Sequence, residues 1–303
     1  MAALTYQIGA VRVHLISDGV FLTDAGGVFG VVPRVLWEKV IQPDALNRIP
    51  MALRCLLIES SAGLLLVDTG YGAKLSVKQM QQLSLVSHTR LTDDLAALGY
   101  RPEEVRMVIN SHLHADHCGG NTYLAPNGLL SDSRRMRPTF PKATYLMQRL
   151  ELADATYPNE RTRNTYFAEN FLPLRDLKDD QGADVLRVLH GDTQITPEVR
   201  VQVTPGHTRS HQVVIIESQG ETAIFLADAG YVANLERLAW VPAFDVEPLV
   251  SIETKRALRE LAYRRDALLF FQHDIAIPAG RIRPDGEGWR VEPAASLAQE
   301  LHS

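Results

Sequence analysis

One stretch decides the interpretation of this chain: Ser111-His-Leu-His-Ala-Asp-His-Cys-Gly-Gly-Asn121. Three imidazoles and one carboxylate fall within six positions, at His112, His114, Asp116 and His117. Burying such a set without partners is costly, because each ring has polar atoms to satisfy and the carboxylate would be stranded as a charge. A bound metal ion resolves both problems. Imidazole and carboxylate ligands without a thiolate favour zinc, with manganese, iron or cobalt as alternatives.

The alternative is a polar loop whose histidines are exposed or only support other ligands. Residues 105–110, just before the cluster, form an apolar run typical of a buried strand, and Gly119 and Gly120 begin the next segment. The cluster is therefore expected at a strand exit, where rigid scaffolds present functional groups. This position favours a metal site.

Length and composition indicate an ordinary globular enzyme. The 303 residues contain no Pro/Gly/Ser-rich linker or charge block, so we predict a single domain over residues 1–303. The chain is 46% hydrophobic and 22% charged, enough for a sizeable core. Its net charge of −5 gives no basic footprint for a polyanion, which argues against a nucleic-acid partner and against a metal-dependent nuclease.

Cys55 and Cys118 lie in or beside apolar segments, so we expect buried free thiols and no disulfide. The N-terminus lacks a basic segment followed by an apolar run, and no stretch reaches the roughly 20 apolar residues needed to span a bilayer. We therefore expect a cytoplasmic protein with no membrane partner.

Hydrophobic periodicity predicts two successions of strands followed by helices, and hence stacked layers. Residues 24–33 are glycine-rich without a Gly-Lys-Ser/Thr sequence, so we expect a flexible substrate-facing loop there and no phosphate site. Thr92 is the expected cap of the first helix. The predicted strands are 11–16, 53–58, 64–67, 105–110, 143–147, 185–189, 199–203, 213–217, 223–226 and 267–271. The predicted helices are 92–98, 149–156 and 252–263.

Three further ligand-type residues follow predicted strands: His207, Asp228 and His273. Each of them alone is typical of a satisfied polar group. Together with the first cluster they make a set too large for one tetrahedral ion. The set suits two ions that share a bridging carboxylate and leave room for solvent or substrate.

The chain at this point resembles the metallo-β-lactamase-fold superfamily, whose His-x-His-x-Asp-His signature stands here at residues 112–117. The resemblance runs in order from Asp68-Thr-Gly70 to His273. It implies an α/β fold of the αββα sandwich type, with two stacked mixed sheets flanked by helices and the metals at their open edge. It also implies that His112, His114 and His207 hold one ion, that Asp116, His117 and His273 hold the other, and that Asp228 bridges them.

Within the superfamily, the strings around the ligands are most like those of the quorum-quenching N-acyl-homoserine lactonases. Asp228 stands where true β-lactamases have Cys or Ser, and Ala115 where flavodiiron proteins have Glu. In the lactonases a tyrosine three residues beyond the bridging aspartate assists at the substrate carbonyl, and Tyr231 occupies that position. The resemblance therefore implies hydrolysis of a small uncharged lactone or carboxyl ester, by a hydroxide that bridges the metals.

Two other activities of this fold stay open. The segment between Cys118 and Gly206 is longer than in the compact lactonases, which leaves phosphotriester (organophosphate) hydrolysis as the alternative. A mononuclear iron enzyme like the persulfide dioxygenases would need only His112, His114 and Asp228. The presence of Asp116, His117 and His273 argues against it.

The remaining candidates have supporting roles. Asp116 is expected to orient the hydroxide or shuttle a proton besides ligating, and Asp68 is expected to fix a histidine tautomer. His211 either supports the ligands or is a structural histidine. The candidates for an apolar acyl pocket are Phe29, Trp37, Trp240 and Phe244, for which a plain core role is the alternative. Monomer and homodimer are both left open.

Overall fold

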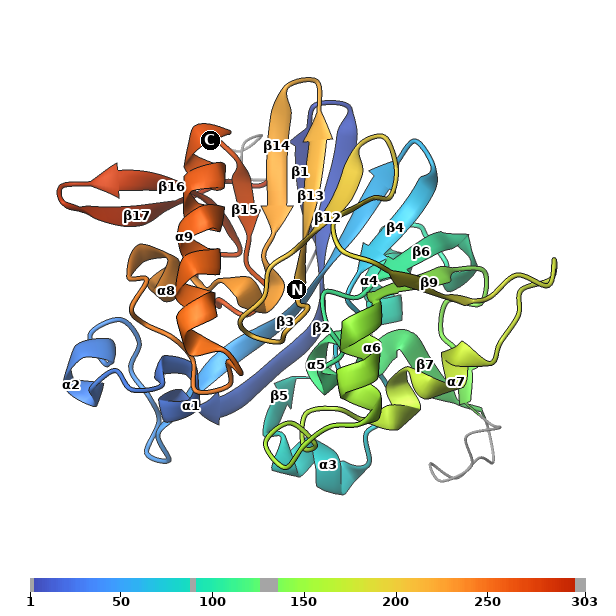
Figure 1. The fold of residues 1–303 in the computed structure, drawn as a ribbon, viewed down its shortest axis with the longest axis horizontal. Coiled ribbons are helices and arrows are strands. Elements are labelled where there is room, and N and C mark those ends of the chain that lie inside the picture. Colours follow the sequence, from blue (N-terminus) through green and yellow to red (C-terminus); the bar gives the residue numbers. More distant parts are fainter. Residues whose placement is uncertain (1–2, 88–90, 126–135, 298–303) are drawn as a thin grey trace.

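The computed structural model describes residues 3–87, 91–125 and 136–297. Two large mixed sheets face each other in these ranges (Figure 1). The first has the order β1-β2-β3-β4-β6-β9-β10, with β5 beside β2, and becomes parallel from β4 onward. Its strands are β1 (Leu4–Ile8), β2 (Val11–Asp24), β3 (Arg48–Ser60), β4 (Gly63–Val67), β5 (Leu85–Ser87), β6 (Val105–Ile109), β9 (Thr144–Gln148) and β10 (Leu186–Leu189).

The second sheet runs in sequence order from β11 to β17. Only its β14–β15 pair is parallel among the described strands. Its strands are β11 (Thr193–Gln194), β12 (Val199–Val203), β13 (Gln212–Ser218), β14 (Glu221–Phe225), β15 (Leu268–Phe270), β16 (Ala279–Asp285) and β17 (Gly288–Pro293). A separate small pair joins β7 (Thr122–Leu124) to β8 (Met136–Pro138).

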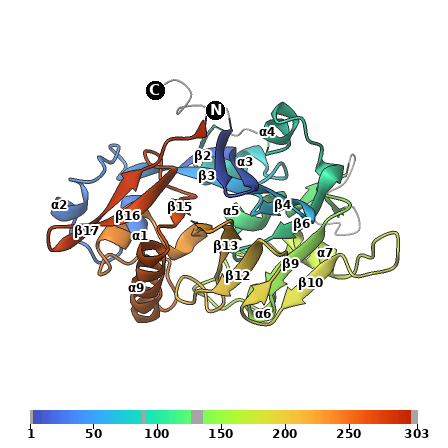
Figure 2. The same cartoon turned by 90° about the horizontal axis from the view of Figure 1, so that it is seen from above.

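Helices cover the outer faces of both sheets. In Figure 2, α9 lies outside the second sheet and α4 lies on the far side of the first. The helices are α1 (Ala25–Phe29), α2 (Arg34–Trp37), α3 (Val77–Gln82), α4 (Leu91–Ala97), α5 (Ala115–Cys118), α6 (Arg149–Thr156), α7 (Leu172–Arg175), α8 (Val232–Glu236) and α9 (Pro248–Arg264).

The period-two alternation of the strands explains the layers. Leu56 of β3 and Val214 of β13 belong to the apolar core between the two sheets. Their neighbours point the opposite way: Leu57 packs in a cluster with Leu95 of α4, and Val213 in a cluster with Leu258 of α9. Each central strand is therefore buried on both faces, as its continuous apolar sequence requires. The αββα prediction is confirmed.

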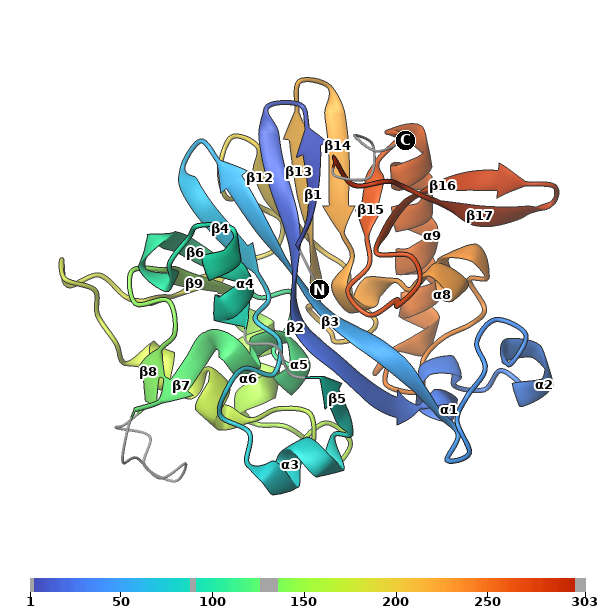
Figure 3. The ribbon, with the colours of Figure 1, turned by 180° about the vertical axis from the view of Figure 1, so that it is seen from behind.

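Most predicted elements are present, but β2 and the glycine-rich segment differ. Strand β2 does not end at Ile16, where the predicted strand 11–16 ends. It passes through a bulge between Ser17 and Val20 and continues to Asp24, alongside the long β3 (Figure 3). Asp-Gly is typical of a turn, but a bulge takes the same residues inside a strand. Helix α4 begins at Leu91, so Thr92 lies inside it and is not its cap.

Residues 24–33 are not simply a loop, because Ala25–Phe29 form α1. The ring of Phe29 is buried and stacks on Trp37, with 5.1 Å between centroids and 5° between planes. This burial holds the segment in a helical turn that its glycines would not favour alone.

Cys55 and Cys118 are free and buried, as predicted. Across the described ranges, no helix combines the length and the apolarity needed to cross a bilayer.

Candidate metal centre

Strand direction brings the predicted ligands to one edge of the sandwich. In the first sheet β6 runs parallel to β4, so both end on the same side. In the second sheet β12 and β14 are both antiparallel to β13, and β15 is parallel to β14, so these three also end together. The residues that follow these strand ends are the candidate ligands.

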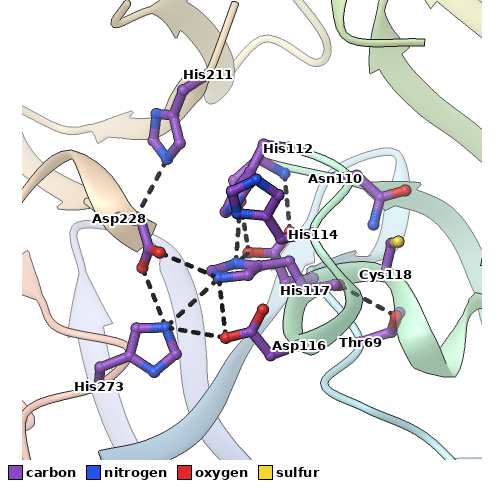
Figure 4. Close-up of polar contacts among 12 residues, drawn as sticks. Thr69, Asn110, His112, His114, Asp116, His117, Cys118, His211, Asp228 and His273 are labelled. Atoms are coloured by element: carbon purple, nitrogen blue, oxygen red, sulfur yellow. Dashed lines mark hydrogen bonds and ion pairs between the residues drawn. The ribbon is translucent and has the colours of Figure 1, made fainter. Parts of the chain in front are cut away.

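The structure brings all seven predicted ligands together. Figure 4 shows His112, His114, Asp116, His117, Asp228 and His273. Their ligand atoms form three groups: His112 with His114 and His207, His112 with His117 and Asp228, and Asp116 with His117 and His273. Within each group the atoms lie within 4.8 Å of one another.

Asp228 has the central position in the cluster. One carboxylate oxygen lies 3.2 Å from His207 Nε2 and 3.5 Å from His117 Nε2, and the other lies 3.0 Å from His273 Nε2. It is the carboxylate that reaches imidazoles of both predicted ligand sets, which is what a bridging role requires.

The outward nitrogens of the rings have acceptors. His117 Nδ1 lies 2.9 Å from Asp68 Oδ2, His207 Nδ1 lies 2.9 Å from Asp245 Oδ1, and His273 Nδ1 lies 2.7 Å from the Ala52 carbonyl oxygen. A ring that donates from Nδ1 keeps a lone pair on Nε2. These three lone pairs therefore point into the cluster.

The inward nitrogens of these rings lie close to one another. His207 Nε2 lies 3.0 Å from His114 Nδ1, and His273 Nε2 lies 3.4 Å from His117 Nε2. His112 Nε2 is buried and has no hydrogen-bond partner among the described residues. Burial and the neighbouring imidazoles hold the pKa of His112 and of His114 well below the ordinary value. Imidazoles that converge with carboxylates in this way are the donor set that divalent metal ions require.

Asp68 contacts both His117 and Ser111 of the histidine-rich loop. Its carboxylate accepts hydrogen bonds from the Ser111 N–H at 2.8 Å and from the Ser111 hydroxyl at 2.7 Å, besides facing His117. Glycines allow the neighbouring loops to approach, since a Cβ on Gly120 would lie 2.3 Å from the Thr69 carbonyl oxygen. The Asp68-Thr-Gly70 segment thus packs against the histidine-rich loop and hydrogen-bonds to it.

His211 lies beside the cluster, with its ring 5.1 Å from that of His112, but it belongs to none of the three groups of candidate ligands. Its Nδ1 lies 2.8 Å from Thr204 Oγ1, and its Nε2 accepts a hydrogen bond of 3.3 Å from the Asp228 N–H. The ring therefore fixes the main chain at Asp228.

Tyr231 is buried beside the cluster. Its ring stacks on His273, with 5.9 Å between centroids and 26° between planes. The residue is fixed through its main-chain N–H, which donates to Asn234 Oδ1 at 2.7 Å. Burial raises the pKa of Tyr231, and the nearby carboxylates raise it further. Its hydroxyl is consequently a hydrogen-bond donor at neutral pH.

A pocket of about 350 Å³ adjoins the cluster. Tyr231 and His273 belong to its lining, and the rest is mainly apolar, including Val28, Phe29 and Met51. Of the four aromatic candidates, only Phe29 lines this pocket. Trp37 and Trp240 pack around Phe29 in a small apolar cluster. Phe244 is 42% exposed, and its ring lies against Gly27.

Sequence reasoning missed several supporting groups. Asp245 is 38 residues from the histidine that it contacts, and the Ala52 carbonyl oxygen is 221 residues from His273. Glu151 was also missed, although its carboxylate accepts from the Leu113 N–H within the motif. None of the three has a local sequence signal beyond being polar or lying in an apolar strand.

Comparison with known proteins agrees with this geometry. The chain belongs to the metallo-β-lactamase superfamily: the family model described as "Metallo-beta-lactamase superfamily" matches residues 51–129 and 138–273. It is accordingly a metal-dependent hydrolase of that superfamily. That one domain extends over all of residues 1–303 stays a prediction.

The similar proteins include lactonases and other metal-dependent hydrolases. An N-acyl homoserine lactonase of Bacillus cereus is 28% identical over 241 residues, which cover 76% of this chain and 84% of the relative. A probable metal-dependent hydrolase from Staphylococcus aureus has a TM-score of 0.84 and 27% identity, with 96% of this chain and 98% of that one covered. AidC, a dizinc quorum-quenching lactonase solved with the product N-hexanoyl-L-homoserine, has the same fold: the TM-score is 0.76 at 17% identity, and 98% of each chain is covered.

Proposed function

We propose that this enzyme hydrolyses lactones or carboxyl esters, in the manner of the N-acyl-homoserine lactonases. The observation that carries the proposal is that His273 of the ligand cluster and Tyr231, whose ring stacks on it, both line the apolar pocket. A substrate whose apolar chain fills the pocket would have its carbonyl beside the cluster. The relatives named as lactonases support the same substrate class.

The seven ligands would hold two divalent ions, with zinc as the first choice and manganese, iron or cobalt as alternatives. His112, His114 and His207 would hold one, Asp116, His117 and His273 the other, and Asp228 would contact both. Bound there, the ions would supply Lewis acidity and a water of lowered pKa.

The chain's own residues would do the rest. The Tyr231 hydroxyl would donate to the oxyanion that develops on the carbonyl oxygen, a contribution of about 2–4 kcal/mol for a single donor. The Asp116 side chain is 20% exposed and lies 3.7 Å from both His117 Nε2 and His273 Nε2. It would orient the attacking water and pass its proton to the leaving oxygen.

The proposal includes a cytoplasmic location. It also includes a small uncharged substrate and no nucleic-acid or membrane partner. The net charge of −5 supports it, because a polyanion would be repelled from the protein. Quorum quenching would be the biological use of such an activity.

The test is a screen of the zinc-loaded enzyme against acyl-homoserine lactones of short and long chain, aryl esters, phosphotriesters and an oligonucleotide. We expect the highest kcat/KM for a lactone or ester. Turnover of phosphotriesters orders of magnitude faster would replace the proposal with organophosphate hydrolysis. One iron per chain, with no hydrolysis, would favour the dioxygenase class.

A further inference from the structure

Glu151 is a buried carboxylate for which the proposed reaction has no role. It lies in the first turn of α6 and is fully inaccessible to solvent. Burying a charged group is costly unless hydrogen bonds replace its hydration. Four neutral donors do so here: the Leu113 N–H at 3.0 Å and the Tyr166 hydroxyl at 3.1 Å on one oxygen, and the Thr208 hydroxyl at 2.6 Å and the Ser210 hydroxyl at 3.2 Å on the other.

Three of these donors touch or adjoin one ligand set. Leu113 stands between His112 and His114 in the chain, and Thr208 directly follows His207. The Tyr166 ring lies 4.9 Å from the ring of His114. One oxygen of Glu151 thus holds the loop after β6, and the other holds the loop after β12. The side chain fixes the distance between the loops that carry these three histidines.

The second ligand set is supported by other groups. His117 is held by Asp68 and His273 by the Ala52 carbonyl oxygen. The hydrogen bonds of Glu151 described above reach neither Asp68 nor Ala52. The two predicted metal positions therefore have different main supports. They share Asp228 and the Ser111 hydroxyl, which donates to Asp68 and lies 3.1 Å from His112 Nδ1.

We propose that Glu151 is a positioning residue that controls metal affinity selectively at the position formed by His112, His114 and His207. This inference rests on the proposed dinuclear function of the same site. Its physical basis is that the two loops come from different sheets, and a single rigid acceptor sets their separation.

The variants Glu151→Gln and Glu151→Ala test it. Zinc affinity is measured in the full-length protein by competition with a chromophoric chelator. In Glu151→Ala we expect one of the two zinc ions to be lost at chelator levels about 10- to 100-fold lower than in the wild type, the usual effect of removing an outer support. Glu151→Gln should show a smaller shift at the same position. Its amide oxygen can still accept from Leu113, and the Thr208 and Ser210 hydroxyls can turn to accept from its NH₂.

Asp154→Asn is the matched control. Asp154 lies on the same helix and bonds Arg209 of the same loop, with 2.9 Å between Oδ2 and Nε, but that pair is partly exposed. Zinc binding should be unchanged in this variant. Anomalous diffraction at the zinc edge in Glu151→Gln crystals, grown at limiting zinc, should show the lower occupancy at the His112 position.

Retention of both ions by the Glu151 variants, or equal weakening of both, would overturn the inference. If Glu151→Ala does not fold, the Gln variant alone decides. A wild-type protein that binds fewer than two zinc ions would instead count against the proposed function, so the two failures are distinguishable.

Discussion

At the scale of single residues, Asp228 and His211 lie next to each other but contact the cluster differently. The Asp228 carboxylate lies within 3.5 Å of imidazole nitrogens from both ligand sets. The His211 ring instead hydrogen-bonds to the Asp228 main-chain N–H and to the Thr204 hydroxyl. Asp228→Ala should therefore weaken the binding of both ions, and His211→Ala should leave the stoichiometry nearly intact. Metal analysis after dialysis measures both. Equal losses in the two variants would contradict the bridging role.

Tyr231 gives the second residue-scale prediction. If its hydroxyl acts in the transition state, Tyr231→Phe should lower kcat and kcat/KM together by about 10- to 1,000-fold, the range for one oxyanion donor. Metal content and unfolding temperature should not change, because the ring that stacks on His273 is retained. Steady-state kinetics on the best lactone or ester decides. Unaltered kinetics would leave carbonyl polarisation to the metals alone.

At the scale of elements, the bulge in β2 joins the strand to two other segments. Asp18 lies in the bulge. Its carboxylate accepts hydrogen bonds from the Gly72 N–H at 2.9 Å and from the N–H of Leu91, at the start of α4, at 3.3 Å. The carboxylate is 1% exposed, so water does not replace it when it is removed. The bulge thereby fixes the loop that follows β4 against the start of α4.

Asp18→Ala should consequently lower the free energy of unfolding by about 1–3 kcal/mol, the cost of leaving buried donors without acceptors. Urea unfolding of the variant and the wild type measures it. Asp44→Ala is the control, since Asp44 also accepts from two main-chain N–H groups but is exposed. Its removal should change stability little, because water can take its place. Equal effects would show that the bulge has no special role.

At the scale of the whole molecule, the cluster lies where the two sheets are joined. The Gln212 N–H of the second sheet donates to the Ser111 carbonyl oxygen at 2.9 Å, and the Ala52 N–H of the first donates to the His273 carbonyl oxygen at 3.1 Å. The ligands belong to loops from both sheets. Ions bound to them would hold the sandwich closed at this edge.

Chelation should therefore abolish activity and also lower Tm. A ligand that binds only the native state stabilises it by about 2.7 kcal/mol at a free concentration of 100 Kd, which corresponds to a shift in Tm of roughly 4 °C for a chain of this size. Scanning calorimetry with and without chelator measures the shift, and adding zinc back should restore both properties. A metal-free preparation with full activity would contradict the metal-dependent assignment.

Local sequence patterns predict the stacked layers and the seven candidate ligands. Apolar runs that end at His112, His207, Asp228 and His273 are local signals, since the period of a strand and the residue at its exit are set within a few positions. The strand predicted at residues 11–16 is too short, because the Asp18-Gly19 pair that follows it is compatible with a turn and with a bulge inside a strand. The loop predicted at residues 24–33 contains a short helix, because the packing of Phe29 against Trp37 stabilises a helical turn there.

The groups that orient the candidate ligands and the residues that line the pocket come together through long-range contacts in the folded chain. Asp245 and the Ala52 carbonyl oxygen reach their histidines across 38 and 221 residues, and Glu151 joins two loops from different sheets. Phe29 lines the pocket, whereas Trp37 packs behind it. Such contacts leave no periodic trace in the sequence, because they depend on how the strand ends and loops pack against one another in the folded chain.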